Sequence, residues 1–298
     1  MDVITPPAVE NPGMEVHIHP FQLHSVNTQT NLPLYLHTSP EFCLKDLLSD
    51  ETEEIDKLFS ISYCFRDEPS SSIHRSQFVM LEWYRKFQRY EKIMEDVQGL
   101  ITYCLVEGKK KGLPVRADME KAVMVKKTMQ EIFQEELSID ILKYLDVPSI
   151  KELLKLYPDV PVPEVDLPWD DYFFLLYLNK IEPNLYKYPL LLLYEFPAPL
   201  SALSTIKPSD NKVCERFEVY IGGIELCNCF NELTDSKEQK KRFTEQARQK
   251  KALYGYELPE PQKFLTVMDH GYPASSGIAL GVDRLLKSLF EVENPFFY

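Results

Sequence analysis

The sequence predicts an α+β fold, an antiparallel sheet flanked by helices, from two observations. The first is a pair of antiparallel connections: a strand at 61–66 returns at 78–84, and strands at 215–221 and 224–230 flank Gly222-Gly223. Because a two-residue hairpin turn favours glycine at both central positions, this spacing is a strong hairpin signal. The second observation is helical periodicity in other parts of the chain.

Helices are predicted where apolar residues recur with helical spacing, at 86–107, 119–145 and 235–253. A shorter helix should start at Ser39-Pro40-Glu41 and run toward Leu48, because serine suits the cap, proline the first helical position and glutamate the first turn. A chain of 298 residues fits one large domain or one domain with an insertion. We predict a single domain over residues 1–298 with a helical insertion around 86–170.

The remaining segments divide into strands and loops. Strands are predicted from alternating or continuous apolar residues at 15–24, 34–38, 190–194 and 276–281, the last of which feeds a helix at 282–286. Loops are predicted from charge, serine or proline content at 50–56, 69–72 and 157–170.

The composition describes a folded protein with an acidic excess. Apolar residues make up 44% of the chain, and the net charge is −13 with a pI near 5.0. Because nonspecific affinity for nucleic acid comes from lysine and arginine neutralising phosphates, tRNA is an unfavoured partner. The cysteines lack paired metal-ligand spacing and indicate reduced thiols. Without a leader-like start or an apolar run long enough for a membrane, we expect a cytoplasmic protein with no membrane partner.

Two arginines lie where they could bind a nucleoside triphosphate. Arg66 ends a predicted strand and is followed by Asp67 and Glu68, so its guanidinium could clamp an α-phosphate while a carboxylate receives an amine. Arg284 follows Gly281 at the start of a helix, where the terminal phosphate could be held. Each segment taken alone is equally typical of a solvated surface.

Two carboxylates could supply a magnesium site. Mg²⁺ usually shares its coordination shell between carboxylates and substrate phosphates, which suits Glu225 and Glu232. Residues seven apart on a regular strand point to opposite faces. Both side chains could therefore bind one ion only if a bulge or a turn lies between them.

Three stretches of the chain match known motifs. Phe65-Arg66-Asp67-Glu68, a loop with His74, and the segment 78–84 (Phe-Val-Met-Leu-Glu-Trp-Tyr) are similar to motif 2 of class II aminoacyl-tRNA synthetases. Gly281-Val282-Asp283-Arg284-Leu285 resembles their motif 3. The segments 224–228 and 232–235 resemble the lysyl branch of that class. The resemblance covers nearly the whole chain in the right order, and it implies the class II catalytic core.

Closer similarity is carried by three further features. Ser39-Pro40-Glu41, the segment 230–235 (Phe-Asn-Glu-Leu-Thr-Asp) and Ala279, at a position where ordinary lysyl synthetases have glycine, resemble the elongation factor P–(R)-β-lysine ligases, a family of lysyl-tRNA synthetase paralogues. This resemblance implies that ATP and Mg²⁺ are used to activate (R)-β-lysine or lysine. It also implies that elongation factor P is the acceptor.

The resemblance implies roles for the residues at matching positions. Arg66 and Arg284 would be catalytic. The ATP site would comprise Arg66, Asp67, Glu68, Arg75, Phe78, Glu225, Leu226, Gly281 and Arg284. The amino acid would contact Ser39, Pro40, Glu41, Tyr84, Glu232 and Ala279. Mg²⁺ would be held by Glu225 and Glu232.

The chain also departs from the family pattern. The motif 2 loop reads His74-Arg75-Ser76-Gln77-Phe78 in place of His-Asn-Pro-Glu-Phe, and Cys229 replaces a glycine. The motif 1 helix expected before Pro6-Pro7 is not in this sequence, so a homodimer is expected from the resemblance alone. Two alternatives are left open: a minimal lysyl-tRNA synthetase and a non-catalytic synthetase-like regulator.

Overall fold

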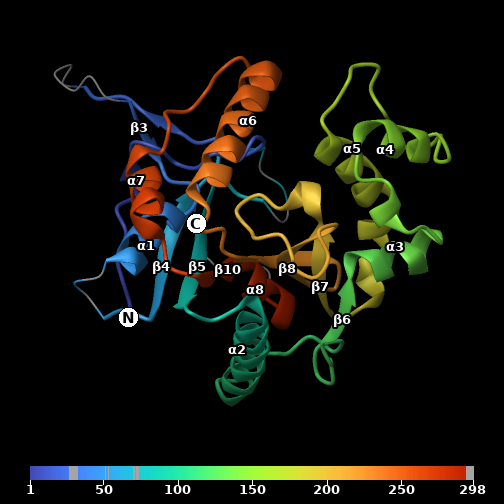
Figure 1. The fold of residues 1–298 in the computed structure, drawn as a ribbon. Helices are drawn as coiled ribbons and strands as arrows, with labels where there is room; N and C mark the ends of the chain where they lie inside the picture. The colour runs from blue at the N-terminus through green and yellow to red at the C-terminus, as the bar shows by residue number, and fades with distance from the viewer. Residues whose placement is uncertain (27–32, 51, 53, 70, 72–73, 293–298) are drawn as a thin grey trace. The chain divides into compact units, whose positions relative to one another are not determined.

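The computed structural model describes residues 1–26, 33–50, 52, 54–69, 71 and 74–292 (Figure 1). The chain divides into two compact units. Unit 1 comprises Met1–Arg89 and Glu232–Asp283, and unit 2 comprises Tyr90–Asn231 and the residues from Arg284 onward. Each unit combines strands with helices, so the predicted α+β class is confirmed. The predicted loops at 50–56 and 69–72 lie partly outside the described residues.

The described residues of unit 1 form two sets of antiparallel strands and three helices. Its elements are β1 (Ala8–Val9), β2 (Gln22–Leu23), β3 (Leu34–Leu36), α1 (Glu41–Ser49), β4 (Lys57–Phe65), β5 (Gln77–Lys86), α6 (Ser236–Tyr254), α7 (Gln262–Gly271) and β10 (Ser275–Gly281). The short strands follow the order β1-β3-β2, and the long ones follow β4-β5-β10. Helix α1 packs on β4, β5 and α7, and α7 also contacts α6 (Figure 1).

Helix α1 begins at the predicted Ser-Pro-Glu sequence. The Ser39 hydroxyl accepts a hydrogen bond from the backbone N–H of Glu41 at 3.0 Å, which satisfies one of the free donors at the helix start. The N-cap position itself is Pro40, one residue later than predicted. The hydrogen bond from Glu41 therefore holds Ser39 beside the first turn of α1, where the Ser39 side chain becomes part of the candidate site.

Unit 2 carries a second set of strands with helices on them. Its elements are α2 (Tyr90–Lys110), β6 (Val125–Thr128), α3 (Met129–Leu137), η1 (Ile141–Lys143), α4 (Val147–Leu154), α5 (Trp169–Leu176), η2 (Tyr177–Ile181), η3 (Glu182–Lys187), β7 (Leu190–Pro197), η4 (Ala198–Leu200), β8 (Val213–Ile221) and β9 (Ile224–Asn231). The strand order is β9-β8-β7-β6, with β6 parallel to β7 and the other pairs antiparallel. Helix α8 (Val282–Leu289) follows β10 and continues into this unit.

The Gly-Gly hairpin is confirmed between β8 and β9. Gly222 and Gly223 have φ values of 56° and 83°, the left-handed conformation that a tight two-residue turn requires. A bulge lies beyond the turn, because Val219 pairs with Cys227 while Tyr220 pairs with Glu225. The extra residue, Leu226, shifts the alternation of β9.

The helix predicted at 119–145 is confirmed only at Met129–Leu137 and is wrong on both sides of α3. Val125–Thr128 forms the parallel strand β6, and α3 starts only at Met129. Thr128 ends the strand and caps the helix: its hydroxyl accepts from Glu131 N–H, and the Glu131 carboxylate accepts from Thr128 N–H. This capping box fixes a strand-to-helix junction that helical periodicity alone does not separate.

The strand predicted at 15–24 is also wrong except at Gln22–Leu23, which forms β2. The buried Lys250 of α6 donates hydrogen bonds from its Nζ to the carbonyls of Glu15, Val16 and Ile18, at 2.8, 2.9 and 2.7 Å. A lysine from a distant helix therefore satisfies carbonyls that a strand neighbour would otherwise bind.

The core of unit 2 is built from the faces of α3, α4, α5 and β7. The predicted strand at Leu190–Tyr194 is confirmed within β7, and Leu191 and Leu193 are fully buried in this core. The proline-rich segment 157–170 is a loop until α5 begins at Trp169. Among the described residues, no helix combines the length and apolarity needed to cross a membrane.

Candidate active site

One face of β5 and β10 gathers polar and small residues of unit 1. Tyr84 on β5 pairs in register with Gly277 on β10, and Glu82 pairs with Ala279. Because side chains two apart on a strand share a face, Glu82 and Tyr84 point to the same side of the sheet. The predicted substrate residues Tyr84 and Ala279 are thus next to a carboxylate that was not predicted.

Glu82 is this additional carboxylate. Its Oε2 accepts a hydrogen bond from the Ser39 hydroxyl at 2.9 Å, and its Oε1 accepts one from the Tyr84 hydroxyl at 2.7 Å. Glu82 is 1% exposed and Tyr84 is 2% exposed. The three side chains form a buried hydrogen-bonded chain from the start of α1 to β5.

Lys45 on α1 lies between two of the predicted carboxylates. Its Nζ donates a hydrogen bond to Glu41 Oε1 at 2.5 Å and lies 2.6 Å from Glu232 Oε2. Lys45 is the partner of Glu232 Oε2, and no other described residue bonds to this oxygen. The side chains of Lys45 and Glu232 are 2% and 1% exposed, which makes this a buried ionic cluster.

Gly277 permits the close approach of two site residues. A Cβ at this position would lie 2.1 Å from Cε1 of the Tyr84 ring and 2.7 Å from Glu232 Oε1. Both distances are shorter than real Cβ contacts, so only glycine fits without moving a neighbour. The backbone of β10 therefore forms one wall of the carboxylate cluster.

Burial in this cluster disfavours the ionised forms of the Glu82 and Glu232 carboxylates. Burial, followed by the charge of Glu41, raises the pKa of Glu82 to about 8. Burial also raises the pKa of Glu232, and the nearby Lys45 opposes this increase. For Lys45, burial acts to lower the pKa, but the attraction of Glu232 and Glu41 outweighs it and raises the pKa. Such a cluster is suited to a cationic ligand, which would relieve the repulsion among the carboxylates.

Arg66 lies next to the carboxyl end of β4. Its guanidinium carbon is 5.2 Å from the centre of the Phe78 ring, and its backbone N–H donates to the Ser76 carbonyl at 2.9 Å. Arg66 Nε is buried and has no hydrogen-bond partner in the described part of the chain. Because buried donors are normally paired, this nitrogen is suited to an anion such as a phosphate. The structure thus brings together Arg66 and Phe78, two residues of the predicted ATP site, and their roles stay predictions.

Unit 2 contains the other predicted phosphate arginine. Arg284 Nη1 donates to the Glu225 backbone carbonyl at 2.8 Å and lies 4.0 Å from Glu225 Oε2. The bulge at Leu226 puts Glu225 on the same face of β9 as Asn228, where a regular strand would place them on opposite faces. The Glu225 side chain is 43% exposed, so its carboxylate is accessible to a hydrated metal ion.

A buried network supports this face of β8 and β9. Arg216 lies between the rings of Phe196 and Phe230, and donates to Asn228 Oδ1 at 3.0 Å and Glu218 Oε1 at 2.5 Å. The Tyr220 hydroxyl donates to the second oxygen of Glu218 at 2.5 Å. The network fixes the side chains beside Glu225, because each polar group has a partner within it.

A family model described as tRNA synthetases class II (D, K and N) matches residues 1–294. The chain belongs to this family. The elongation factor P–(R)-β-lysine ligases of Proteus mirabilis and Erwinia tasmaniensis are 33% and 34% identical to it, over 98% of this chain and 85% of each relative. The ligase of Salmonella paratyphi B is 34% identical over 96% of this chain and 83% of its own length. The resemblance found in motifs 2 and 3 is therefore confirmed.

The synthetase residues predicted from the motifs divide between the two units. Ser39, Pro40, Glu41, Tyr84, Glu232 and Ala279, together with Arg66, Asp67, Glu68, Arg75, Phe78 and Gly281, belong to unit 1. Glu225, Leu226 and Arg284 belong to unit 2. Within unit 1 the structure joins Ser39 to Tyr84 through Glu82, and Glu41 to Glu232 through Lys45. The roles of all these residues stay predictions.

Glu82 and Lys45 are the site residues that sequence reasoning missed. Glu82 lies inside motif 2, two residues before Tyr84, and the strand alternation that places both on one face is the signal that could have found it. Lys45 is four residues after Glu41, a spacing that brings side chains together on a helix. Both signals were weak, because an isolated glutamate or lysine is usually solvated.

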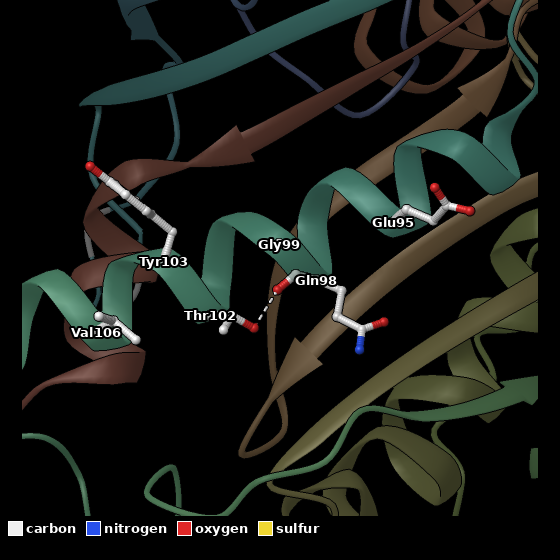
Figure 2. A pocket seen from close by; sticks show the side chains of 6 residues that line it. All are labelled: Glu95, Gln98, Gly99, Thr102, Tyr103 and Val106. Atoms are coloured by element: carbon white, nitrogen blue, oxygen red, sulfur yellow. Dashed lines mark hydrogen bonds between the residues drawn. The ribbon is translucent and has the colours of Figure 1, made fainter.

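A shallow hollow along α2 contains none of the candidate site residues. Glu95, Gln98, Gly99, Thr102, Tyr103 and Val106 line it, and all come from one helix (Figure 2). The Thr102 hydroxyl donates to the Gln98 carbonyl at 2.8 Å within the helix. Polar groups from other elements do not line the hollow, so it has no features of a catalytic site.

The raised pKa of Glu82 predicts a stability that decreases with pH. Its ordinary value is 4.5 and its folded value is about 8, so the folded protein binds more protons than the unfolded chain between these values. The stability contribution is complete below pH 4.5 and is lost as the pH rises through 8. Between pH 6 and 8, the ligand-free protein should lose about 2 kcal/mol of unfolding free energy.

Thermal or urea unfolding across this pH range measures the effect. Glu82→Gln is the matched variant, because the amide keeps the shape but cannot ionise. Its stability should be nearly constant over the same range. A wild-type stability that does not change with pH, or a Glu82→Gln slope equal to that of the wild type, would contradict the prediction.

Proposed function

We propose that this protein is an ATP-dependent ligase that activates (R)-β-lysine or lysine as an aminoacyl-adenylate. It then transfers the aminoacyl group to a lysine side chain of elongation factor P. The observation that carries the proposal is the cluster of Glu41, Glu82 and Glu232 around the single ammonium of Lys45. Because the pKa of Glu82 is about 8 in the ligand-free protein, the full formal charge of −2 would develop when a cationic ligand favours its ionised form. A substrate with two ammonium groups matches that charge.

The first step joins the amino acid to ATP. A carboxylate oxygen of the amino acid attacks the α-phosphorus, the bond from that phosphorus to the β-bridging oxygen breaks, and pyrophosphate leaves with the electron pair. Arg66 would stabilise the negative charge that develops on the α-phosphate, and Arg284 would hold the terminal phosphate. The carboxylate cluster would fix the ammonium groups, so that the carboxylate of the amino acid is presented to the phosphorus.

The second step forms an amide. The ε-amine of the acceptor lysine attacks the carbonyl carbon of the adenylate, AMP leaves with the bridging oxygen, and the new amide nitrogen loses a proton. Glu225 and Glu232 are the proposed Mg²⁺ ligands, and the ion would neutralise phosphate charge. Glu225 fits this role through its exposed carboxylate, whereas the Glu232 carboxylate is 1% exposed and paired with Lys45, so it fits an ammonium group better than a metal ion.

The net charge supports a protein acceptor over RNA. At −13, the protein as a whole repels phosphate backbones, whereas a protein with a basic face would be attracted to it. The three named relatives carry elongation factor P in their names. A cytoplasmic location and a homodimer stay predictions.

ATP–pyrophosphate exchange tests the proposal directly. Exchange is measured with lysine and with (R)-β-lysine, and the intact masses of elongation factor P and the charging of tRNA are then compared. We expect exchange with at least one of these amino acids, a lysyl-sized mass increase on elongation factor P, and uncharged tRNA. Charged tRNA would instead indicate a minimal lysyl-tRNA synthetase. No exchange with any amino acid would indicate a non-catalytic regulator.

A further inference from the structure

Lys45 has surroundings that resemble a binding site for a substrate ammonium. Its Nζ contacts carboxylate oxygens from two separate segments, Glu41 on α1 and Glu232 before α6. It also lies 6.0 Å from the centre of the Tyr84 ring and 5.5 Å from that of Phe264. Carboxylates and ring faces together form the environment that an organic cation prefers.

We propose that Lys45 is an internal counter-ion of the amino acid pocket, and that a substrate ammonium replaces it at Glu232 when a diamino acid binds. In the ligand-free protein, Lys45 keeps Glu41 and Glu232 close together despite their like charges. It acts on the substrate through these carboxylates and is therefore a positioning residue. This inference rests on the proposed function, because it requires a substrate with two ammonium groups.

The two contacts of Lys45 differ in a way that identifies the exchangeable one. The bond to Glu41 joins residues one turn apart on the same helix and has hydrogen-bond geometry, so the helix backbone maintains it. The contact with Glu232 joins two separate segments, so no helix backbone maintains it. Lys45 is the partner of the buried Glu232 Oε2, so a substrate N–H that replaces Lys45 there would keep this oxygen paired.

When Lys45 moves away, the groups around Glu232 do not compensate the negative charge of its carboxylate. The charges and hydroxyls that act on this cluster come from Glu41 on α1, Glu82 and Tyr84 on β5, and Tyr272 after α7. Apart from Lys45, these groups are acidic or neutral. An incoming ammonium would therefore compensate the charge that Lys45 releases.

The test compares lysine with analogues that lack one ammonium each. Norleucine lacks the side-chain ammonium, and 6-aminohexanoate lacks the α-ammonium. Dissociation constants are measured by calorimetry for the wild type, for Lys45→Met and for Lys250→Met. The last is a matched control, because Lys250 is also a buried lysine of unit 1 but donates to backbone carbonyls.

We expect Lys45→Met to increase the preference for lysine over at least one singly charged analogue by about tenfold, because the substrate ammonium no longer competes with Lys45 for Glu232. Lys250→Met should lower the melting temperature and keep the wild-type preference. If Lys45→Met binds all three ligands with the wild-type ratios, or loses the preference for lysine, the inference is wrong. If the wild type itself binds neither lysine nor (R)-β-lysine, the proposed function fails instead.

A second variant covers the case in which Lys45→Met does not fold. Lys45→Met combined with Glu232→Gln removes the ammonium together with its fully buried partner, so the carboxylate that loses its cation is that of Glu41, which is 14% exposed. Recovery of folding by the double variant would support the counter-ion role. Failure of the double variant to fold would show that Lys45 is needed for packing, and would overturn the inference.

Discussion

Replacing Arg66 with alanine should lower the rate of ATP–pyrophosphate exchange with lysine by about 100-fold to 1,000-fold, equivalent to about 3 kcal/mol of transition-state stabilisation. Arg66 stacks on Phe78 and has a buried Nε with no partner among the described residues. In the proposed reaction, this guanidinium stabilises the negative charge that develops on the α-phosphate. Its loss should therefore affect kcat more than the KM for lysine.

Two variants make the result specific. Arg66→Lys keeps the charge but loses the planar guanidinium, so it should restore only part of the activity. Arg248→Ala is the matched control, because Arg248 is an exposed arginine of the same unit that pairs with Glu245. Its exchange rate should equal that of the wild type. Wild-type exchange by Arg66→Ala would show that Arg66 does not contact the reacting phosphate.

Replacing Gly277 with alanine should weaken lysine binding by about 10-fold to 100-fold, because inserting a methyl group into a tightly packed site costs about 1–3 kcal/mol. The new Cβ would meet the Tyr84 ring at 2.1 and 2.4 Å and Glu232 Oε1 at 2.7 Å. Tyr84 cannot move freely, since its hydroxyl is bonded to Glu82 at 2.7 Å. The strain should therefore displace the carboxylates that would hold the substrate.

The measurement is the dissociation constant for lysine, with the melting temperature recorded for the same samples. Gly99→Ala is the matched control, because nothing lies within 4 Å of a Cβ at this position in α2. An alanine there should leave lysine binding unchanged and should stabilise the helix slightly. Unchanged lysine affinity in Gly277→Ala would mean that the substrate does not bind beside β10.

Short-range signals in the sequence located helix and hairpin boundaries better than contacts between distant segments. The Ser39-Pro40-Glu41 signal located the start of α1, and Gly222-Gly223 located the hairpin, because both depend on short-range backbone preferences. The boundaries that failed depend on distant partners. The backbone carbonyls of Glu15, Val16 and Ile18 accept hydrogen bonds from Lys250 of α6, and no local pattern predicts that contact.

The sequence by itself determined the fold class and the family, but it did not single out Glu82 or Lys45 as residues of the candidate site. The tertiary structure alone decided how the charges of this site are paired. Glu82 joins the cluster because strand register places it beside Ala279, and Lys45 joins because α1 packs against β4 and β5. The bulge at Leu226 likewise decides which face of β9 carries Glu225. Register, packing and bulges depend on interactions between distant segments, so residue spacing along the chain does not contain them.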